Sequence, residues 1–358
     1  MIYFAIILTI LILVEVIFRI LYKKKYGRNY HVSIQLPWKK NYVATHPFLT
    51  FCYKKNSVIN VNQKIPYKLH PNVYSSFKEP IQINNMGHFG KDFSTIKNDT
   101  IRVACLGNSN IANNISDGVN DYSVPTLLEK CLNKNGKFEV CNFNIGGWVS
   151  VDVLIDFVLN VVRTKPDYVI LCHGFTDLYL YLLDNFEPDY SHGRRNLGNK
   201  IWKIKLAYLF PKIRLFHFYE FLRDKFLGTG NIRDDVIGLV RMGKVNNNNN
   251  YDNLFVEKDI LKNIFILCSY YKIKLIACSY PFYNYDHSKI SNKIEEGIDI
   301  ENSNMKELAK EFGFPFCDLQ NILPKEDKYF LDWVHLTPDG MGILTKEIKK
   351  ELDNYMEE

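Results

Sequence analysis

The sequence predicts an α/β protein in which a parallel sheet is covered by helices on both faces. From residue 101 onward, short β-rich runs alternate with stretches of helical periodicity, which is typical of β-α-β units. Hydrophobic residues make up 47% and charged residues 23% of the 358 positions, which excludes a mainly disordered chain. The length is sufficient for one to three domains with a sizeable core.

Five β-rich runs are expected to form the sheet, and the helical periods between and after them are expected to form its two covering layers. The strands are expected at 101–106, 138–143, 167–172, 273–279 and 314–317, and the helices at 122–133, 150–164, 256–271, 299–312 and about 338–355. The result is a three-layer α/β/α arrangement with about five parallel strands. Catalytic residues on such sheets collect at the carboxyl ends of the strands.

The first residues favour a membrane anchor. Residues 2–21 are nearly all apolar, and about 20 residues is the length of a transmembrane helix. Glu15 and Arg19 interrupt this run but stand four apart, so they can pair on one helix face. No Lys or Arg precedes the run and no small-residue cleavage site follows it, which disfavours a removable signal peptide. An amphipathic surface helix and a buried core helix remain the alternatives.

The distribution of charge fits a membrane surface better than nucleic acid. The net charge is +6, but residues 1–28 carry an excess of four positive charges and residues 194–225 an excess of seven. A nucleic-acid-binding protein would have a broad basic face instead. Lys23–Lys25 and Arg28 follow the apolar run, and positive flanks prefer the cytoplasm. This gives a weak preference for a single-pass protein with its main body on the cytoplasmic face.

The cysteines indicate neither a disulfide framework nor a zinc site. There are eight, with no CxxC pair among them. Four lie in the apolar strand-like runs, where free thiols pack as small hydrophobic groups: Cys105, Cys141, Cys172 and Cys278.

We divide the chain into three regions. Residues 1–28 are the anchor, residues 29–98 a small β or irregular region, and residues 99–358 the α/β domain with an insertion at 178–255. The insertion interleaves aromatic with basic residues, which favours a helical cap packed on the core. A sharper interpretation adds contact with lipid headgroups or an anionic substrate.

Polar residues follow the first three strands at the points where they end. Gly107-Asn108-Ser109 follows the first, and a serine there can act as a nucleophile if a base removes its proton. Gly146-Gly147 follows the second, and a backbone N–H at such glycines can approach a developing oxyanion. Gly174-Phe175-Thr176-Asp177 follows the third. Each motif alone is equally compatible with an ordinary strand-to-helix turn, with Ser150 or Asp177 as a helix cap.

Near the C-terminus, Asp332 precedes His335 by three residues. A carboxylate at this spacing can orient and polarise the imidazole, so one short loop supplies a base that lacks only a serine. Pro338 fixes the start of the helix that follows. A surface histidine is the ordinary alternative.

In their order and placement, these motifs resemble the SGNH (GDSL-type) hydrolase family. The resemblance covers residues 101–177 and about 325–352, and it implies a flavodoxin-like fold. The upstream segment Asn85-Met86-Gly87-His88-Phe89-Gly90 is also similar to a segment that precedes the catalytic domain in membrane-anchored members.

The resemblance implies a role for each matching residue. Ser109 is the expected nucleophile, His335 the general base and acid, and Asp332 the residue that holds His335. The backbone N–H groups of Ser109 and Gly147 are expected to form part of the oxyanion hole, with Thr176 at the third donor position. The family has Asn where this chain has Thr176, and loss of an oxyanion donor can lower the rate about 10²–10³-fold.

The leading hypothesis is therefore a membrane-anchored serine ester hydrolase or acyltransferase. It would act on an acyl ester of a carbohydrate or lipid, without a metal or other cofactor and without nucleic acid. The alternative from another class is a weakly active or inactive binding or scaffold protein in envelope glycan assembly, which Thr176 favours. A nucleotide-binding domain is disfavoured because the chain has no glycine-rich phosphate loop.

Overall fold

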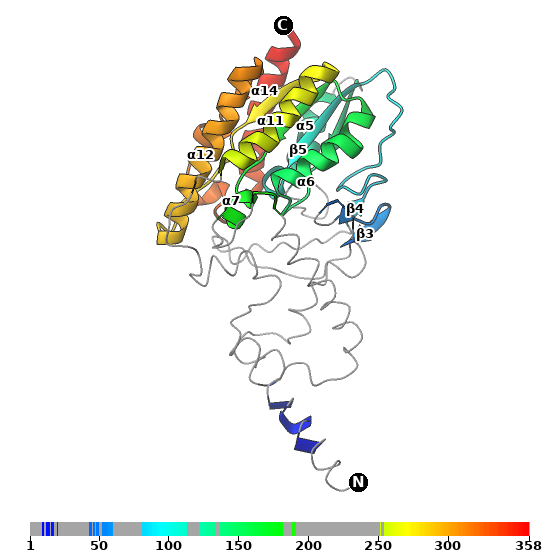
Figure 1. Ribbon diagram of the computed structural model, residues 1–358. Coiled ribbons are helices and arrows are strands. Elements are labelled where there is room, and N and C mark those ends of the chain that lie inside the picture. Colours follow the sequence, from blue (N-terminus) through cyan, green and yellow to red (C-terminus); the bar gives the residue numbers. More distant parts are fainter. Residues whose placement is uncertain are drawn as a thin grey trace. The chain divides into compact units, whose positions relative to one another are not determined.

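The structure is a computed structural model, and its described residues are 9–10, 12–14, 16–17, 20, 43–44, 46, 48–49, 52–59, 81–112, 122–133, 137–181, 188–190, 251 and 254–357. The chain divides into two compact units. One comprises Asn41–Tyr181 and Asn248–Glu358 and contains the large sheet (Figure 1). The other comprises Met1–Lys40 and Leu182–Asn247, and the residues described in it are helical positions between Thr9 and Ile20 and the turn at 188–190.

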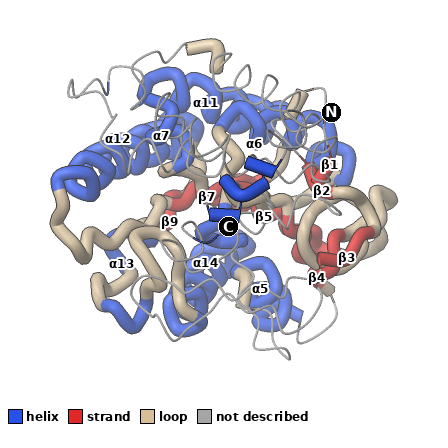
Figure 2. The backbone as a smooth tube through the Cα atoms, turned by 90° about the horizontal axis from the view of Figure 1, so that it is seen from below, coloured by secondary structure: helices blue, strands red, loops and turns tan. Residues whose placement is uncertain are grey.

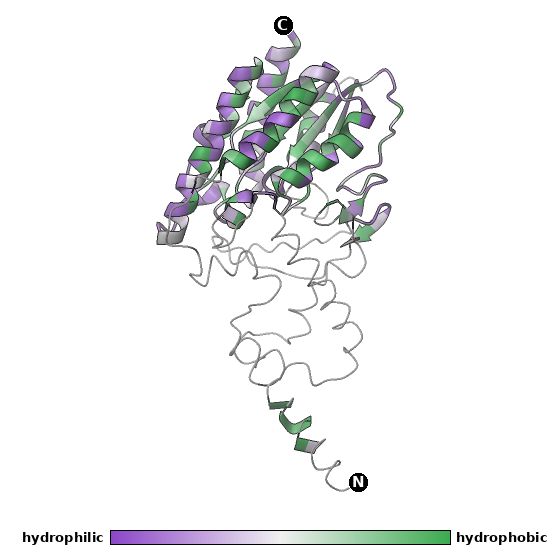
Figure 3. Ribbon diagram, in the orientation of Figure 1, coloured by the Kyte–Doolittle hydropathy of each residue, from purple (hydrophilic) through white to green (hydrophobic). Residues whose placement is uncertain are grey.

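The predicted anchor and the predicted insertion lie largely outside the described residues. The described positions between 9 and 20 are helical and mainly hydrophobic (Figure 3). Their large apolar side chains, such as Ile10, Leu13 and Ile17, are exposed. Within the ranges given above, no helix is both long and apolar enough to cross a bilayer. Of the insertion at 178–255, the structure describes only 178–181, 188–190, 251 and 254–255.

The main sheet has five parallel strands, as the sequence predicts. They are β5 (Ile101–Gly107), β6 (Phe138–Asn142), β7 (Tyr168–Cys172), β8 (Lys274–Cys278) and β9 (Phe316–Cys317). Their spatial order is β6-β5-β7-β8-β9, so the chain runs from β5 out to the β6 edge and then back across to β7. This is the flavodoxin-like order, and its switch point lies between β5 and β7.

Helices form two layers with the sheet between them (Figure 2). One layer contains α5 (Val124–Leu132) and α14 (Pro338–Glu357), which contact each other. The other contains α6 (Ser150–Asp156), α11 (Leu254–Tyr271) and α12 (Lys289–Phe312). Because both faces are covered, the strands are continuous apolar runs without polar alternation, and all five residues of β7 are buried.

Helix positions agree with the sequence at most ends, but α12 begins ten residues before the predicted start at 299. Its first turn is capped by Ser288, whose hydroxyl accepts the N–H of Ser291 at 3.1 Å. The early turns are rich in charged residues, and this obscured the spacing of the buried Ile294 and Ile298. Burying one apolar side chain per turn is enough to continue the helix along the sheet.

The core thiols are where the sequence predicts them. All eight cysteines are free, and Cys105, Cys141, Cys172 and Cys278 are buried in strands. Burial raises the pKa of the Cys172 thiol to about 12, which removes it from nucleophilic chemistry near neutral pH.

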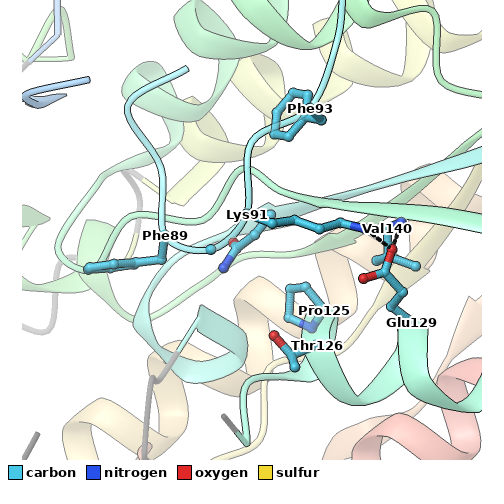
Figure 4. A pocket seen from close by; sticks show the side chains of 9 residues that line it. Phe89, Lys91, Phe93, Pro125, Thr126, Glu129 and Val140 are labelled. Carbon is cyan, nitrogen blue, oxygen red and sulfur yellow. Dashed lines mark hydrogen bonds and ion pairs between the residues drawn. The ribbon is translucent and has the colours of Figure 1, made fainter. Parts of the chain in front are cut away.

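The described part of residues 29–98 contains four short strands in two antiparallel pairs. β1 (Val43–Ala44) pairs with β2 (Cys52–Tyr53), and β3 (Ser57–Ile59) with β4 (Ile81–Ile83). Residues 89–93, after β4, line a small pocket together with α5 and β6. In this pocket Lys91 forms an ion pair with Glu129 (Figure 4).

His88, from the upstream motif, is buried in this segment. Its Nε2 lies 3.1 Å from Asp156 Oδ2 on α6, and its ring packs edge-on against Phe143 and Trp148. The upstream motif therefore packs against the loop between β6 and α6 through His88.

Candidate active site

Ser109 lies at the carboxyl end of β5, where the strand turns into the short helix α4 (Ser109–Ala112). The turn requires glycine at 107, because a Cβ there would lie 1.9 Å from the carbonyl oxygen of Cys172. Asn108 is buried and donates through Nδ2 to the carbonyl of Gly174 at 2.6 Å, which ties the end of β5 to the end of β7. The serine is thus held at the switch point of the sheet.

Asp332 and His335 form one unit in the loop before α14. Asp332 Oδ1 accepts the backbone N–H groups of Val334 and His335 at 3.0 and 2.8 Å, and Oδ2 lies 2.7 Å from His335 Nδ1. Because Asp332 is held by backbone groups of its own loop, it presents one oxygen to the imidazole in a fixed direction. This leaves His335 Nε2 available on the other side of the ring.

His335 Nε2 lies 3.0 Å from Ser109 Oγ. The structure therefore brings the three residues predicted to form the triad into one hydrogen-bonded chain. The side chains of His335 and Asp332 are 28% and 32% exposed, so the hydrogen-bonded row of three residues is open to solvent on one side. A substrate can approach Ser109 from there.

The surroundings of His335 favour the protonated form of its imidazole. Desolvation lowers the pKa of His335, but the charge of Asp332 and the hydrogen bond to it outweigh this and raise the pKa above its ordinary value of 6.5. For Asp332, desolvation acts upward, but the charge of His335 and the hydrogen bonds it accepts hold the pKa below its usual range. The pair thus stabilises the imidazolium that forms when a serine loses its proton.

The glycines after β6 allow the loop to approach Ser109 closely. A Cβ on Gly146 would lie 3.2 Å from Ser109 Cβ, which is tighter than ordinary contact. Gly147 has φ of +85°, a conformation that favours glycine. Sequence reasoning selected Gly147 and missed the steric requirement at Gly146, which depends on a contact between loops far apart in the chain.

Thr176, the third predicted oxyanion donor, is engaged inside the protein. Its hydroxyl donates to the carbonyl of Trp148 at 2.6 Å and accepts from Asn108 Nδ2 at 3.1 Å. An oxyanion would have to compete with the Trp148 carbonyl for this proton. The hydroxyl links the three strand-end loops, and its role as a donor stays a prediction.

A buried polar cluster that sequence reasoning missed lies behind the loop after β7. Asp177, on α7 (Thr176–Tyr181), accepts from Ser150 through its N–H at 2.9 Å and its hydroxyl at 2.7 Å. His173, Glu257 and Glu301 surround it and are also buried. Glu257 could have been noticed, since it is an acidic residue among buried apolar positions of α11.

Comparison with known proteins identifies a family. The profile of the GDSL-like Lipase/Acylhydrolase family matches residues 105–343, and no curated protein matches the chain.

Three solved structures with related folds illustrate the similarity. An acetyl xylan esterase is 14% identical, with a TM-score of 0.41 over 69% of this chain and 98% of that one. A GDSL-like lipase from Bacteroides thetaiotaomicron is 15% identical, with a TM-score of 0.41 over 74% and 93%. A mutant of an acetyl-xylooligosaccharide esterase from Geobacillus Stearmophilus is 13% identical, with a TM-score of 0.43 over 72% and 96%. Likeness at this level carries no information about substrate.

The family profile covers more than half of the 358 residues, including both of the distant segments that meet at Ser109 and His335. The chain therefore belongs to the GDSL-like lipase/acylhydrolase family.

Proposed function

We propose that this protein is a membrane-anchored serine ester hydrolase or acyltransferase in which Ser109, His335 and Asp332 act as a catalytic triad. The observation that carries the proposal is the 3.0 Å contact between His335 Nε2 and Ser109 Oγ, on an imidazole already oriented by Asp332 at 2.7 Å. Nucleophile, base and orienting group in this arrangement are the requirements for activating a serine.

The proposed reaction has two halves that use the same base. His335 takes the Ser109 proton as Oγ attacks the ester carbonyl, and the backbone N–H groups of Ser109 and Gly147 are proposed to hold the oxyanion. His335 then gives the proton to the departing alkoxide, which leaves an acyl-enzyme. A water or a hydroxyl of an acceptor loses its proton to His335, attacks the acyl carbonyl and releases Ser109 with its proton restored. No cofactor is needed for this sequence.

The proposed substrate is an acyl ester of a carbohydrate or lipid. Trp333, between Asp332 and His335 in the chain, is partly exposed and lies near Tyr285, with ring centroids 6.4 Å apart; Tyr283 lies 5.9 Å from Tyr285. Partly exposed aromatic rings in and next to the loop that carries His335 would suit the apolar face of a sugar ring or an acyl chain. The triad serves hydrolysis and transfer equally, because only the attacking oxygen differs.

A membrane location is proposed from the N-terminal segment. Apolar side chains are exposed on the described helical residues there, for example 54% for Ile10 and 61% for Ile20, and a bilayer would cover such a surface. Lys23–Lys25 and Arg28 favour the cytoplasmic face for the main body. A reporter fused to the C-terminus of the full chain tests this preference, and a signal only outside the membrane would reverse it.

The alternative is a binding or scaffold protein with weak or no activity. The observation that favours it is the Thr176 hydroxyl, which donates to the carbonyl of Trp148 at the position where the family resemblance implies an Asn amide donor. The two functions differ in one respect that is simple to measure, namely whether Ser109 is nucleophilic.

The test uses a fluorophosphonate probe and a short-chain 4-nitrophenyl ester on the full-length protein. We expect labelling and turnover in the wild type, loss of both in Ser109→Ala, and strong reduction in His335→Ala. Ser303→Ala is the matched control, because Ser303 is exposed on α12 and should leave both signals unchanged. A folded wild type that neither labels nor turns over ester would favour the scaffold function.

A further inference from the structure

Four ionisable side chains are packed together behind the loop that carries Thr176. His173 and Asp177 belong to that loop and the start of α7, Glu257 to α11 and Glu301 to α12. None is more than 3% exposed. Three carboxyl groups at one buried place are unusual, because each ionised carboxylate loses its hydration there.

The contacts divide the cluster into two pairs. Both carboxylate oxygens of Asp177 have hydrogen-bond partners. They accept the backbone N–H and the hydroxyl of Ser150, and Oδ2 lies 2.7 Å from His173 Nε2. Glu301 Oε2 accepts the backbone N–H of Phe175 at 2.7 Å. Glu301 Oε1 and both oxygens of Glu257 meet no donor with good geometry in the described part of the chain.

The Phe175 contact has a conformational consequence. Phe175 has φ of +65°, which is unfavourable for a side chain of this size and persists only where surrounding contacts impose it. The hydrogen bond from the Phe175 N–H to the Glu301 carboxylate is such a contact, and Phe175 directly precedes Thr176 in the chain. Tyr280, whose ring stacks on Phe175, closes the same side of the loop.

The two glutamates cannot both be ionised without a cation. Across the described ranges, neither forms an ion pair with Lys or Arg, and the charged or titratable groups facing them are His173, Asp177 and each other. Burial, followed by the charges of Glu301 and Asp177, raises the pKa of Glu257 well above its ordinary value. Burial also raises the pKa of Glu301, but the Phe175 N–H and the hydrogen bond with Glu257 oppose this, so Glu301 is the more acidic of the two.

We propose that Glu257 and Glu301 share one proton and act as a latch on the loop between β7 and α7. Glu257 keeps the proton and donates it toward Glu301, and Glu301 carries the charge that holds the Phe175 N–H. When the proton is lost, two adjacent carboxylates repel each other across α11 and α12, and the loop is released. Glu257 and Glu301 are therefore positioning residues, and the link to catalysis rests on the function proposed above.

A divalent metal is the competing occupant of this cluster. Donor atoms of His173, Asp177 and Glu257 all lie within 4.8 Å of one another, and a cation would neutralise them. The distances favour the proton, because His173 Nε2 and Asp177 Oδ2 are already at hydrogen-bond distance while His173 Nε2 and Glu257 Oε1 are 4.0 Å apart. Ligands sharing one ion would be spaced more evenly around it.

The test is thermal unfolding of the full-length protein between pH 6 and 9. The folded state holds a proton that the unfolded chain has already released above pH 4.5, so the free energy of unfolding falls as pH rises through this window. We expect the Tm of the wild type to fall by about 2–4 °C per pH unit more than that of Glu257→Gln. The Gln amide donates to Glu301 without needing a titratable proton.

Two further variants keep the test decisive. The double variant Glu257→Gln/Glu301→Gln removes both carboxyl groups and should flatten the profile as well, so it decides the question if Glu257→Gln does not fold. Glu311→Gln, at an exposed position of α12, is the control and should keep the wild-type slope. Equal slopes in the wild type and both buried variants would overturn the latch, as would a stoichiometric divalent metal in the purified protein whose removal lowers the Tm.

A second measurement connects the latch to the active site. The rate of fluorophosphonate labelling of Ser109 should fall toward alkaline pH in the wild type, as the shared proton is lost, and persist in Glu257→Gln. If the wild type is never labelled, the proposed function fails while the thermal profile still decides the latch.

Discussion

His335 Nε2 lies 3.0 Å from Ser109 Oγ, although the two residues are 226 positions apart in the chain. The contact arises because β5 and the loop before α14 both end at the same edge of the parallel sheet. The turn at Gly107 fixes the position of Ser109, and Asp332, which is bound to backbone N–H groups, fixes that of His335. The two side chains are therefore in contact before any substrate binds.

The pH profile of kcat/KM should report His335. Its raised pKa means that the base form is present only above a pH higher than 6.5, so activity should fall about tenfold per pH unit below that point. Asp332→Asn removes the charge that raises the pKa, so the midpoint should move to lower pH and the plateau should fall about 10²–10⁴-fold.

The matched control for this profile is Asp339→Asn, on an exposed position of α14. It should reproduce the wild-type curve. A midpoint that Asp332→Asn leaves in place would assign the titration to another group.

Gly146→Ala should impair the reaction more than the fold. The new methyl group would meet Ser109 Cβ at 3.2 Å, and relief requires Ser109 or the loop to move by a few tenths of an ångström. A misplacement of about 1 Å can cost about 10²-fold in rate, so this smaller shift should reduce kcat by up to about tenfold. Steady-state kinetics with a 4-nitrophenyl ester, together with Tm, separates the two effects.

Gly342→Ala provides the comparison for this glycine. It lies on α14, where an added Cβ meets no atom within 4 Å, so kcat should not change and Tm should stay equal or rise. Wild-type kcat in Gly146→Ala would show that the loop can adjust freely beside Ser109.

Thr176→Val should destabilise the protein because it removes a hydroxyl that satisfies two loops. The carbonyl of Trp148 loses its donor, and Asn108 Nδ2 keeps only its bond to Gly174. A buried polar group left without a partner costs about 1–3 kcal/mol. Urea unfolding measures this difference.

Thr176→Ser retains the hydroxyl and should keep most of the stability. Its kcat is equally informative: a value near that of wild type, with Thr176→Val much slower, would support donation to the oxyanion as well as a linking role. Equal stability of all three proteins would argue against the loop contacts described above.

The sequence predicted what depends on local pattern. The strand ends predicted at 106, 143 and 172 lie within one residue of the observed ends, because the apolar runs stop at polar residues there. The spacing of Asp332 and His335 identified one compact unit. Parallel order then placed these ends at one edge, so the proximity of Ser109 and His335 could be expected before any distance was known.

Features that depend on contacts between distant segments could not be predicted. Nothing local to Gly146 reveals the nearby Ser109 Cβ, and nothing local to Glu301 reveals the N–H of Phe175, 126 positions away. The hydroxyl of Thr176 was expected to face the substrate, whereas the loop after β6 supplies a carbonyl that engages it. Such partners are set by tertiary packing and have no period or motif.

His88→Ala should destabilise the protein and also slow the reaction. His88 packs against Phe143 and Trp148 and lies beside Asp156 Oδ2, so its loss leaves a cavity and removes one of the partners of a buried carboxylate, at about 3–5 kcal/mol. Trp148 follows Gly147 in the chain, and its carbonyl accepts the Thr176 hydroxyl. A shift of Trp148 would therefore displace Gly147 and Thr176, two of the proposed oxyanion donors.

Lys91→Ala is the control from the same segment. Its ion pair with Glu129 (Figure 4) is partly exposed, so the substitution should change the free energy of unfolding by less than about 1 kcal/mol. Urea unfolding and ester turnover on both variants decide the matter, and equal effects of the two substitutions would mean that the segment after β4 does not support the active site.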